Sequence, residues 1–514
     1  MMHADQPVPV PAGLVLVPFR AARFSASGPA LAALTSPPYD IIDDAERAQL
    51  QARDAHNVVR LILPGDDYDG AARTLQEWLD GGVLRRDDKA SIYVCEEEQD
   101  GHVQRGLIGA VALADPEAGI ILPHENTMAG PVSDRLALTR ATRANLEPIF
   151  LLYSGGGETS RIVSELVTTP PQVETTTDDG VTHRLWAIDD PTVLTAVAAD
   201  LLPRRAVIAD GHHRYATYRQ YQAERHAAGD GSGPWDFGLA FLVDATVSGP
   251  QVHPIHRAVT ELGLAAAVRR AAAEFTVRRL AGPDVAGPDT AGPDTAGPDT
   301  AGPDTAGPDT AGPDTAGPDT AGPDTAGPDT AGPDTAGPDT AGPDTAGRAP
   351  DVTATRSGGE PGSAQGPAGR SGGGVDPDHL LDELAKAGQG SHAFVVTDGT
   401  SAYLLTEPTA ALLARSLPAG RSAAFRRLDV TVAHLALIVD VWGLADTVGV
   451  VDYHHDAPAA IAAAAAAGGT ALLLNPTPVA DVTSVAEAGE RMPRKSTLFT
   501  PKPRTGLVLR PLHA

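Results

Sequence analysis

The stretch Ala206-Val-Ile-Ala-Asp-Gly-His-His-Arg-Tyr215 decides most of what the sequence predicts about the fold. A short apolar run, typical of a buried strand, ends in an Asp-Gly turn, and two histidines and an arginine then open a long polar stretch. We expect a helix from about His213 to Ala228, because Gly229 follows as a residue suited to the C-terminal side of a helix. The stretch therefore predicts a strand, a glycine turn and a helix in direct succession.

A junction of this kind favours an anion, because the backbone N–H groups at a helix start are unpaired and carry partial positive charge. Gly211, His212 and His213 lie at this junction, and Arg214 would add a charged fork for phosphate or carboxylate. Asp210 and the histidines would hold a metal ion or move a proton. The alternative is a tight turn in which Asp210 caps the helix and the histidines lie on the surface.

A pentapeptide array separates two parts of the chain. One Ala-Gly-Pro-Asp-Val unit and twelve Ala-Gly-Pro-Asp-Thr units fill residues 281–345. No unit carries a large apolar residue, so the array buries too little surface to offset the entropy of ordering it. We expect a disordered insertion; the alternative is an array of turns that binds a cation or a partner through its aspartates. Deleting residues 281–345 is expected to leave the thermal stability unchanged.

The charge and composition exclude several classes of protein. The net charge is -27, and it is -14 without the thirteen aspartates of the array, so we expect no broad nucleic-acid-binding face. The single cysteine, Cys95, excludes an internal disulfide and is expected in a strand. No apolar run approaches the roughly twenty residues of a membrane span, so we expect a cytoplasmic protein with no membrane association.

Outside the array, strand-like and helical segments alternate, which predicts an α/β or α+β fold with mixed sheets covered by helices. We expect an N-terminal α/β region (1–100), a central region with the Asp-Gly-His-His-Arg sequence (101–280), a disordered linker (281–377) and a C-terminal α/β region that completes the core (378–514). The main predicted strands are 14–19, 58–63, 91–95, 106–113, 149–153, 239–243, 393–397, 402–405 and 471–475, a hairpin is predicted over 176–190, and helices are predicted at 71–80, 134–145, 191–202, 430–442 and 457–467.

Three more polar clusters fall on predicted loops or element ends, where functional residues concentrate. Asp40 follows two prolines in Ser36-Pro-Pro-Tyr-Asp40, as a cap or a site residue. His124 and Glu125 form a pair that would deprotonate a hydroxyl or bind a divalent ion, unless they form an ion-paired surface turn. The third cluster is basic and suits a phosphate-holding loop or a solvated turn; it contains Arg491, Arg494, Lys495, Ser496, Thr497, Lys502 and Arg504.

Seven short blocks of this chain resemble the signature of the domain of unknown function 1015 family, in that family's order. They are Ser36-Pro-Pro-Tyr-Asp40, His124-Glu125, Asp134-Arg135-Leu136, Ala209-Asp-Gly-His-His-Arg-Tyr215, His253-Pro-Ile-His-Arg257, Asn475-Pro-Thr477 and Met492-Pro-Arg-Lys-Ser-Thr497. The resemblance extends from about residue 14 to 508, and the family implies no reaction. The pentapeptide array is a departure from it.

The Asp-Gly-His-His-Arg turn is also similar to the phosphate-binding box of the ParB/sulfiredoxin superfamily, which includes nucleotide-binding clamps and a small-molecule kinase. This similarity implies a ParB/sulfiredoxin-like central part, and nucleotide phosphates held by Gly211, His212, His213 and Arg214. It also implies Glu125 as a base, and ATP or CTP with Mg²⁺ as the ligand.

Three hypotheses about function follow. The first is a phosphate- or nucleotide-binding enzyme, a small-molecule kinase or phosphohydrolase, with Glu125, His124 and Asp210 catalytic and Gly211–Arg214 and Lys495–Thr497 on the phosphate. The second is a nucleotide-sensing ParB-like binding protein without turnover. The third is a metal-dependent hydrolase that uses the histidines, among which His253, His256, His454 and His455 form two more clusters.

Overall fold

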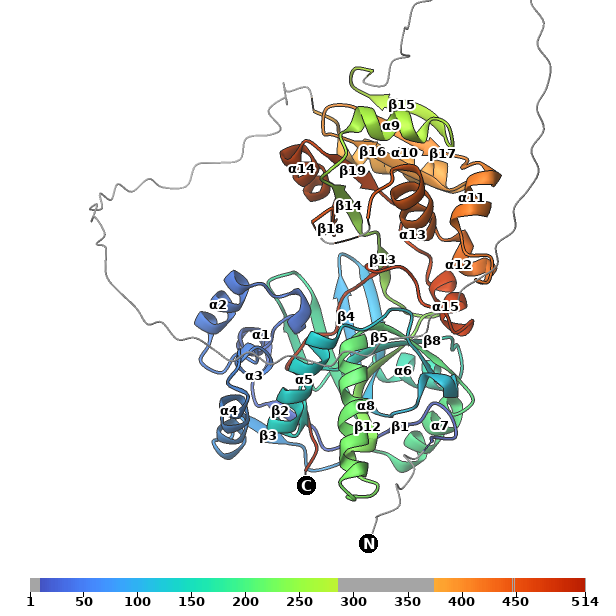
Figure 1. Cartoon of the computed structure of the whole chain (residues 1–514). Helices are drawn as coiled ribbons and strands as arrows, with labels where there is room; N and C mark the ends of the chain where they lie inside the picture. The colour runs from blue at the N-terminus through green and yellow to red at the C-terminus, as the bar shows by residue number, and fades with distance from the viewer. Residues whose placement is uncertain (1–9, 285–373, 446, 448, 514) are drawn as a thin grey trace, which may run out of the picture. The chain divides into compact units, whose positions relative to one another are not determined.

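The computed structural model describes residues 10–284, 374–445, 447 and 449–513, and two large sheets organise them (Figure 1). The first sheet has nine strands and is mixed, since β8 is antiparallel to β11 and parallel to β12. Its strands lie in the order β6 (Ile121–Leu122), β11 (Ala206–Asp210), β8 (Ile149–Tyr153), β12 (Phe237–Asp244), β5 (His102–Ala112), β4 (Ile92–Gln99), β10 (Thr182–Ile188) and β9 (Val173–Thr176), with β1 (Leu16–Val17) paired to β5. This arrangement confirms a mixed α/β fold.

Helices cover this sheet because its strands alternate between two buried cores. In β4, Tyr93 and Cys95 pack into one core, and Ile92 and Val94 pack into the other. The first core also takes residues of α4 (Tyr68–Asp80) and α5 (Ala129–Thr142), and the second takes residues of α6 (Glu158–Leu166), α7 (Pro191–Leu201) and α8 (His212–Ala227). α5 and α8 lie against each other, so the helix that opens with His212 has a fixed position.

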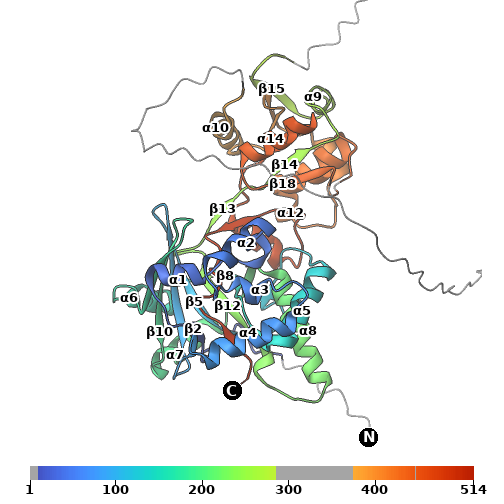
Figure 2. The same cartoon turned by 90° about the vertical axis from the view of Figure 1, so that its left-hand side faces the viewer.

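The N-terminal helices lie beside the same sheet. They are α1 (Gly28–Leu34), α2 (Asp44–Arg53), α3 (Val59–Ile62) and α4, drawn in blue toward the viewer in Figure 2. The predicted helix 71–80 is confirmed within α4, where Leu75 and Trp78 are buried as expected. The short helical turn η1 (Tyr39–Ile41) follows the two prolines, so Asp40 lies at a helix start.

The predicted strand at 58–63 is wrong, because residues 59–62 form α3. Its three apolar residues are buried and Arg60 is partly exposed, and a short apolar run does not distinguish a buried strand from a buried helix. The Asn57 side chain accepts the Val59 N–H at 2.9 Å and favours the helical start. The predicted helix 430–442 is present as α13 (Asp429–Thr431) continued by a π-helical segment, η4 (Val432–Val441).

The second sheet takes strands from both sides of residues 285–373. Its six strands lie in the order β15 (Thr276–Ala281), β17 (Ala402–Thr406), β16 (Ala393–Thr397), β19 (Thr470–Leu473), β14 (His256–Val259) and β18 (Val451–His454). The helices α9 (Leu264–Ala271), α10 (Pro377–Gly388) and α14 (Ala457–Ala467) pack against these strands. The predicted linker 281–377 begins at the last residue of β15 and ends at the first residue of α10; its centre, with the pentapeptide array beyond Asp284, lies outside the described residues.

The segment from 498 to 511 contacts parts of the chain that are far apart in sequence. β20 (Leu498–Thr500) pairs with β13 (Gln251–His253), and β21 (Arg510–Pro511) pairs with β7 (Ala144–Asn145). Between them, Ser36 and Thr505 exchange backbone hydrogen bonds of 3.1 and 3.0 Å. This path brings Lys502 to Asp210 at the end of β11.

Candidate functional site

The start of α8 leaves backbone donors unpaired. Gly211 has a φ of +88°, a left-handed conformation that glycine adopts without strain, and it turns the chain from β11 into α8. The Tyr215 N–H bonds the Gly211 carbonyl at 2.9 Å, and no side chain caps the helix. The backbone N–H groups of residues 212–214 therefore have no hydrogen-bond partner within the described part of the chain.

Asp210 does not cap the helix, because two cations hold its carboxylate. One oxygen accepts a hydrogen bond from Lys502 Nζ at 2.7 Å, and the other accepts one from Arg214 Nη2 at 2.6 Å. Burial alone would raise the pKa of Asp210, but the charges of Lys502 and Arg214 outweigh it and hold the pKa well below its usual range. Asp210 is therefore ionised at neutral pH, and each of its oxygens is bound by a cationic side chain.

Arg214 points into the protein rather than toward solvent, with 3% of its surface exposed. Besides Asp210, its guanidinium binds the Pro148 carbonyl through Nη1. Only Nε has no partner, and an added Cβ at Gly211 would lie 3.0 Å from it. The two terminal nitrogens of Arg214, which the sequence suggests for phosphate, are thus bound by Asp210 and Pro148.

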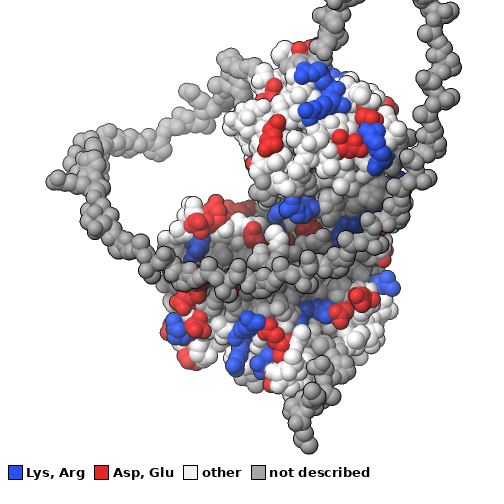
Figure 3. Space-filling model, in the orientation of Figure 1, with Lys and Arg blue, Asp and Glu red and all other residues white. Residues whose placement is uncertain are grey.

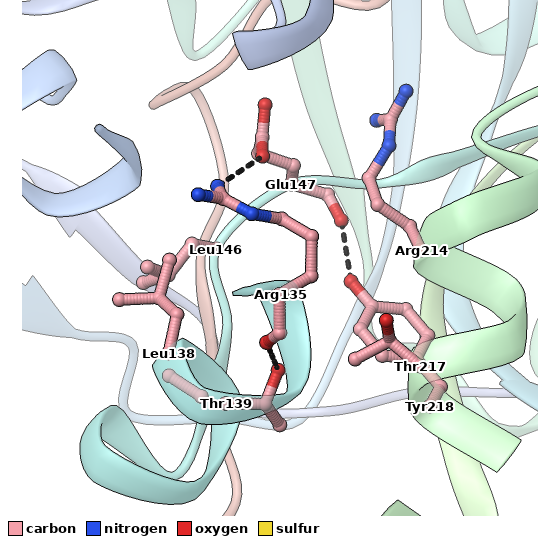
Figure 4. A pocket seen from close by; sticks show the side chains of 9 residues that line it. Arg135, Leu138, Thr139, Leu146, Glu147, Arg214, Thr217 and Tyr218 are labelled. Atoms are coloured by element: carbon pink, nitrogen blue, oxygen red, sulfur yellow. Dashed lines mark hydrogen bonds and ion pairs between the residues drawn. The ribbon is translucent and has the colours of Figure 1, made fainter. Parts of the chain in front are cut away.

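A cavity lies behind Arg214 and contains a buried glutamate that the sequence analysis missed (Figure 4). Glu147 lies 4.0 Å from Arg135 Nη1, and its carbonyl accepts a 2.7 Å hydrogen bond from the Tyr218 hydroxyl. Burial raises the pKa of Glu147 despite the opposing charges of Arg214 and Arg135. The cavity is small and partly open to solvent, and it is lined by Arg135, Leu138, Thr139, Ala144, Leu146, Glu147, Arg214, Thr217 and Tyr218.

The histidines at this junction are joined to the loop at 122–128. His124 and His212 have ring centroids 4.6 Å apart, and the His124 backbone N–H donates to His212 Nε2 at 3.3 Å. His213 is half-buried and its Nε2 accepts the Met128 N–H at 3.0 Å. Burial lowers the pKa of His124 to about 4 and that of His212 well below its usual value, so both rings are neutral at pH 7.

Glu125 lies beside the loop at 491–497, called the basic loop below. Burial raises the pKa of its carboxyl, against the charge of Lys495 and a hydrogen bond from the Ser496 backbone. Asp210 and Lys502 also act on this carboxyl electrostatically, so Glu125, the basic loop and the end of β11 share one neighbourhood. Asp40 belongs to it too, since its charge raises the pKa values of His213 and Lys502.

The C-terminal basic cluster does not form one free patch. Arg504 is buried against Thr35, to which it donates from Nε at 3.1 Å, and Lys502 is paired with Asp210. Lys495 is exposed, and its ammonium has no hydrogen bond or ion pair to any residue that the structure describes. On the face drawn in Figure 3, acidic and basic side chains of the described residues are interspersed.

Two contacts fix the loop that carries Lys495. The Met492 N–H donates to the His124 carbonyl at 2.8 Å. Arg257, which is 1% exposed, donates to the Lys495 carbonyl at 3.0 Å, and its other contacts include His434 of η4. Lys495 itself has a φ of +52°, uncommon for a residue with a side chain, so the loop is held in a specific conformation.

Of the remaining predicted histidines, His256 and His454 lie opposite each other on the paired strands β14 and β18, while His253 and His455 have other neighbours. His253 Nε2 lies 2.6 Å from Thr500 Oγ1, and His256 Nδ1 accepts the Leu474 N–H at 3.3 Å. His455 is exposed, and Lys495 and Lys502 contribute to lowering its pKa, so it lies near the basic loop. Within the described ranges, no three His, Cys, Asp or Glu side chains are grouped so as to hold a metal ion.

Cys95 lies in β4, as expected, and burial raises the pKa of its thiol well above the usual value. No helix in the described part of the chain is long and apolar enough to cross a membrane.

These features define a mixed α/β protein with a polar site at the start of α8, built from the loop at 122–128, the end of β11 and the basic loop. The chain belongs to the family described as "Protein of unknown function (DUF1015)", whose model matches residues 16–431. The match confirms the family resemblance; two of its seven blocks, at 475–477 and 492–497, lie beyond the matched residues. No curated protein matches the chain, and no solved structure does.

Proposed function

We propose that the start of α8 binds a phosphate group of a nucleotide or another small phosphate ester, and that the protein transfers or hydrolyses that group. The observation that carries this proposal is the row of three unpaired backbone N–H groups at 212–214, with the exposed and unpaired Lys495 in the same neighbourhood. Oriented amides at a helix start and a nearby ammonium are the groups that stabilise phosphate charge.

The cation proposed to bind the phosphate differs from the one that the sequence alone suggests. Lys495, rather than Arg214, is the cation with no competing partner, while Arg214 and Lys502 hold Asp210 and so fix the turn at Gly211. The similarity of Asp-Gly-His-His-Arg to the ParB/sulfiredoxin box is a further argument for phosphate binding at this turn. By that analogy His212 and His213 face the ligand chiefly through their backbone amides.

Glu125 is the proposed general base. Its raised pKa makes it a stronger base than an exposed carboxylate, and the Ser496 amide orients it. The positive charges of Lys502 and Arg214 at the Asp210 carboxylate disfavour a resident Mg²⁺ there. Mg²⁺ would enter with ATP or CTP as part of the substrate.

A thermal-shift titration tests binding. ATP, CTP and inorganic phosphate, each with and without Mg²⁺, are added to the wild type, to Lys495→Met and to Lys89→Met. Lys89 is also exposed but pairs with Asp189 and serves as the control. A ligand at a hundredfold excess over its dissociation constant stabilises the fold by about 2.7 kcal/mol. We expect a shift in the wild type and in Lys89→Met, and a smaller shift in Lys495→Met; no shift with any ligand would refute the proposal.

Glu125→Gln separates an enzyme from a binding protein. If the protein turns over its ligand, this variant should keep the thermal shift and lose turnover by roughly 10²–10⁴-fold. A wild type that binds nucleotide without consuming it, with any acceptor supplied, would instead support the nucleotide-sensing alternative.

A further inference from the structure

One hydroxyl near the start of α8 is paired with a buried base. Thr497 Oγ1 lies 3.2 Å from His124 Nε2, and Thr497 is partly exposed whereas His124 is 0% exposed. A nucleophile within hydrogen-bond distance of a histidine, with a third group that orients the histidine, is the arrangement that activates serine and threonine hydroxyls.

His124 Nδ1 has no hydrogen-bond partner among the described residues, and the Ile208 carbonyl of β11 is the backbone group that acts on the ring and favours a proton on it. Because burial keeps the ring neutral, it carries one N–H and one acceptor nitrogen. With the N–H toward Ile208, Nε2 accepts, and the Thr497 hydroxyl donates to it.

The pair lies next to the proposed phosphate site. His124 contacts His212, the first residue of α8, through both its ring and its backbone N–H. Contacts thus run from the Thr497 hydroxyl through His124 to the His212 side chain at the start of α8.

We propose that Thr497 is a covalent nucleophile that accepts a phosphoryl group. Resting on the proposed function, the step uses a nucleoside triphosphate as co-reactant. Thr497 Oγ1 forms a bond to the terminal phosphorus, the bond from that phosphorus to the bridging oxygen breaks, and the nucleoside diphosphate leaves with the bonding electron pair. The hydroxyl proton moves to His124 Nε2. Water or an acceptor hydroxyl then forms a bond to the phosphorus and gives its proton to Glu125. The bond from phosphorus to Thr497 Oγ1 breaks, and His124 returns its proton to that oxygen.

A second threonine–histidine pair provides a matched control. Thr500 and His253 lie 2.6 Å apart on the paired strands β20 and β13, so they share the hydroxyl–imidazole contact. His253 does not contact α8, and the groups that act on its pKa are burial and His102. Thr500→Ala should therefore leave any phosphorylation unchanged.

The test is acid-quenched intact-mass spectrometry of the full chain after incubation with ATP and Mg²⁺, followed by peptide mapping. Wild type and Thr500→Ala should gain one phosphoryl group on Thr497, Thr497→Ala should gain none, and Thr497→Ser should keep it. Where the adduct is too short-lived to accumulate, ATP consumption decides: Thr497→Ala should lose it at least about 10²-fold.

Thr497→Ala that consumes ATP at the wild-type rate would overturn the nucleophile, as would a phosphoryl group mapped elsewhere. The thermal shift with ATP keeps the two proposals apart. If ATP shifts the melting temperature of both Thr497→Ala and wild type, but no adduct forms and ATP consumption does not depend on Thr497, only the nucleophile is refuted. If ATP does not shift the melting temperature of the wild type, the phosphate site itself is refuted.

Discussion

Lys502 Nζ lies 2.7 Å from Asp210 Oδ1, across 292 residues of sequence. The contact links the segment that follows β20 to the end of β11, and Arg214 holds the other oxygen of the same carboxylate. Removing one partner of a buried ion pair leaves the other charge uncompensated. The pair is thus a structural support for the Gly211 turn, and this role can be separated experimentally from ligand binding.

Lys502→Met should lower the free energy of unfolding by about 1–3 kcal/mol, less than a fully buried pair because Arg214 still holds Asp210. Urea unfolding at pH 7 measures the loss. Lys495→Met is the matched variant, and it should change stability by less than about 0.5 kcal/mol, since the Lys495 side chain is exposed. Equal losses in the two variants would contradict the supporting role of Lys502.

Gly211→Ala should destabilise the protein more than Gly229→Ala. Both glycines have left-handed φ angles, +88° and +85°, so both substitutions carry the cost of about 1–2 kcal/mol for a side chain there. A Cβ at Gly211 would also meet Arg214 at 3.0 Å, whereas a Cβ at Gly229 meets nothing within 4 Å. The difference in melting temperature between the two variants measures the added effect; a difference of zero would mean that Arg214 yields freely.

Stability should fall as the pH drops from about 6.5 toward 4. Burial lowers the pKa values of His124 and His256 to about 4 in the folded state, from 6.5 in an exposed histidine. The folded protein therefore binds fewer protons than the unfolded chain in this window, and each histidine contributes up to roughly 3 kcal/mol that is present above pH 6.5 and lost toward pH 4. Urea unfolding at several pH values, with His256→Gln as the comparison, should show a shallower dependence in the variant.

The position of a deletion near the pentapeptide array should decide its effect. Ala281 pairs with Ala402 in the second sheet, and Tyr403 donates to Asp284 at 2.9 Å. Deleting residues 281–345 removes these contacts and should lower the melting temperature, contrary to the simplest expectation from the repeat alone. Deleting 286–345 spares them and should leave the melting temperature within about 2 °C of the wild type. Equal melting temperatures for the two deletions would show that the end of β15 contributes nothing.

Local sequence patterns predicted much of the fold, because they depend on neighbouring residues. The Asp-Gly-His junction, the strand at 149–153 and the hairpin at 393–405 follow from apolar runs and turn residues within a few positions. The helix α3 did not follow, since three of its four residues are apolar and buried, a pattern that a buried strand shares.

The sequence analysis named most residues of the candidate site as candidates, but it did not predict which residues they contact. Glu125, His124 and Thr497 do share a neighbourhood with α8, as the hypothesis required. The sequence did not reveal that Lys502 binds Asp210 or that Arg214 donates to the Pro148 carbonyl, because these contacts join residues that are distant in the chain. Glu147 gave no signal at all, since a single glutamate before a strand has no distinctive pattern.

The order in which the strands are synthesised differs from the order in which they pair. β14 is made before the array, yet its neighbours β18 and β19 are made after it, and β7 waits for β21. On the ribosome, the second sheet therefore has apolar strand faces and an open edge until β18 and β19 have emerged, whereas all nine strands of the first sheet precede the array. Such long-range pairing is slow and exposes aggregation-prone surface. A cell that makes this protein has to keep the growing chain from associating with itself through the whole translation of the Ala-Gly-Pro-Asp repeats.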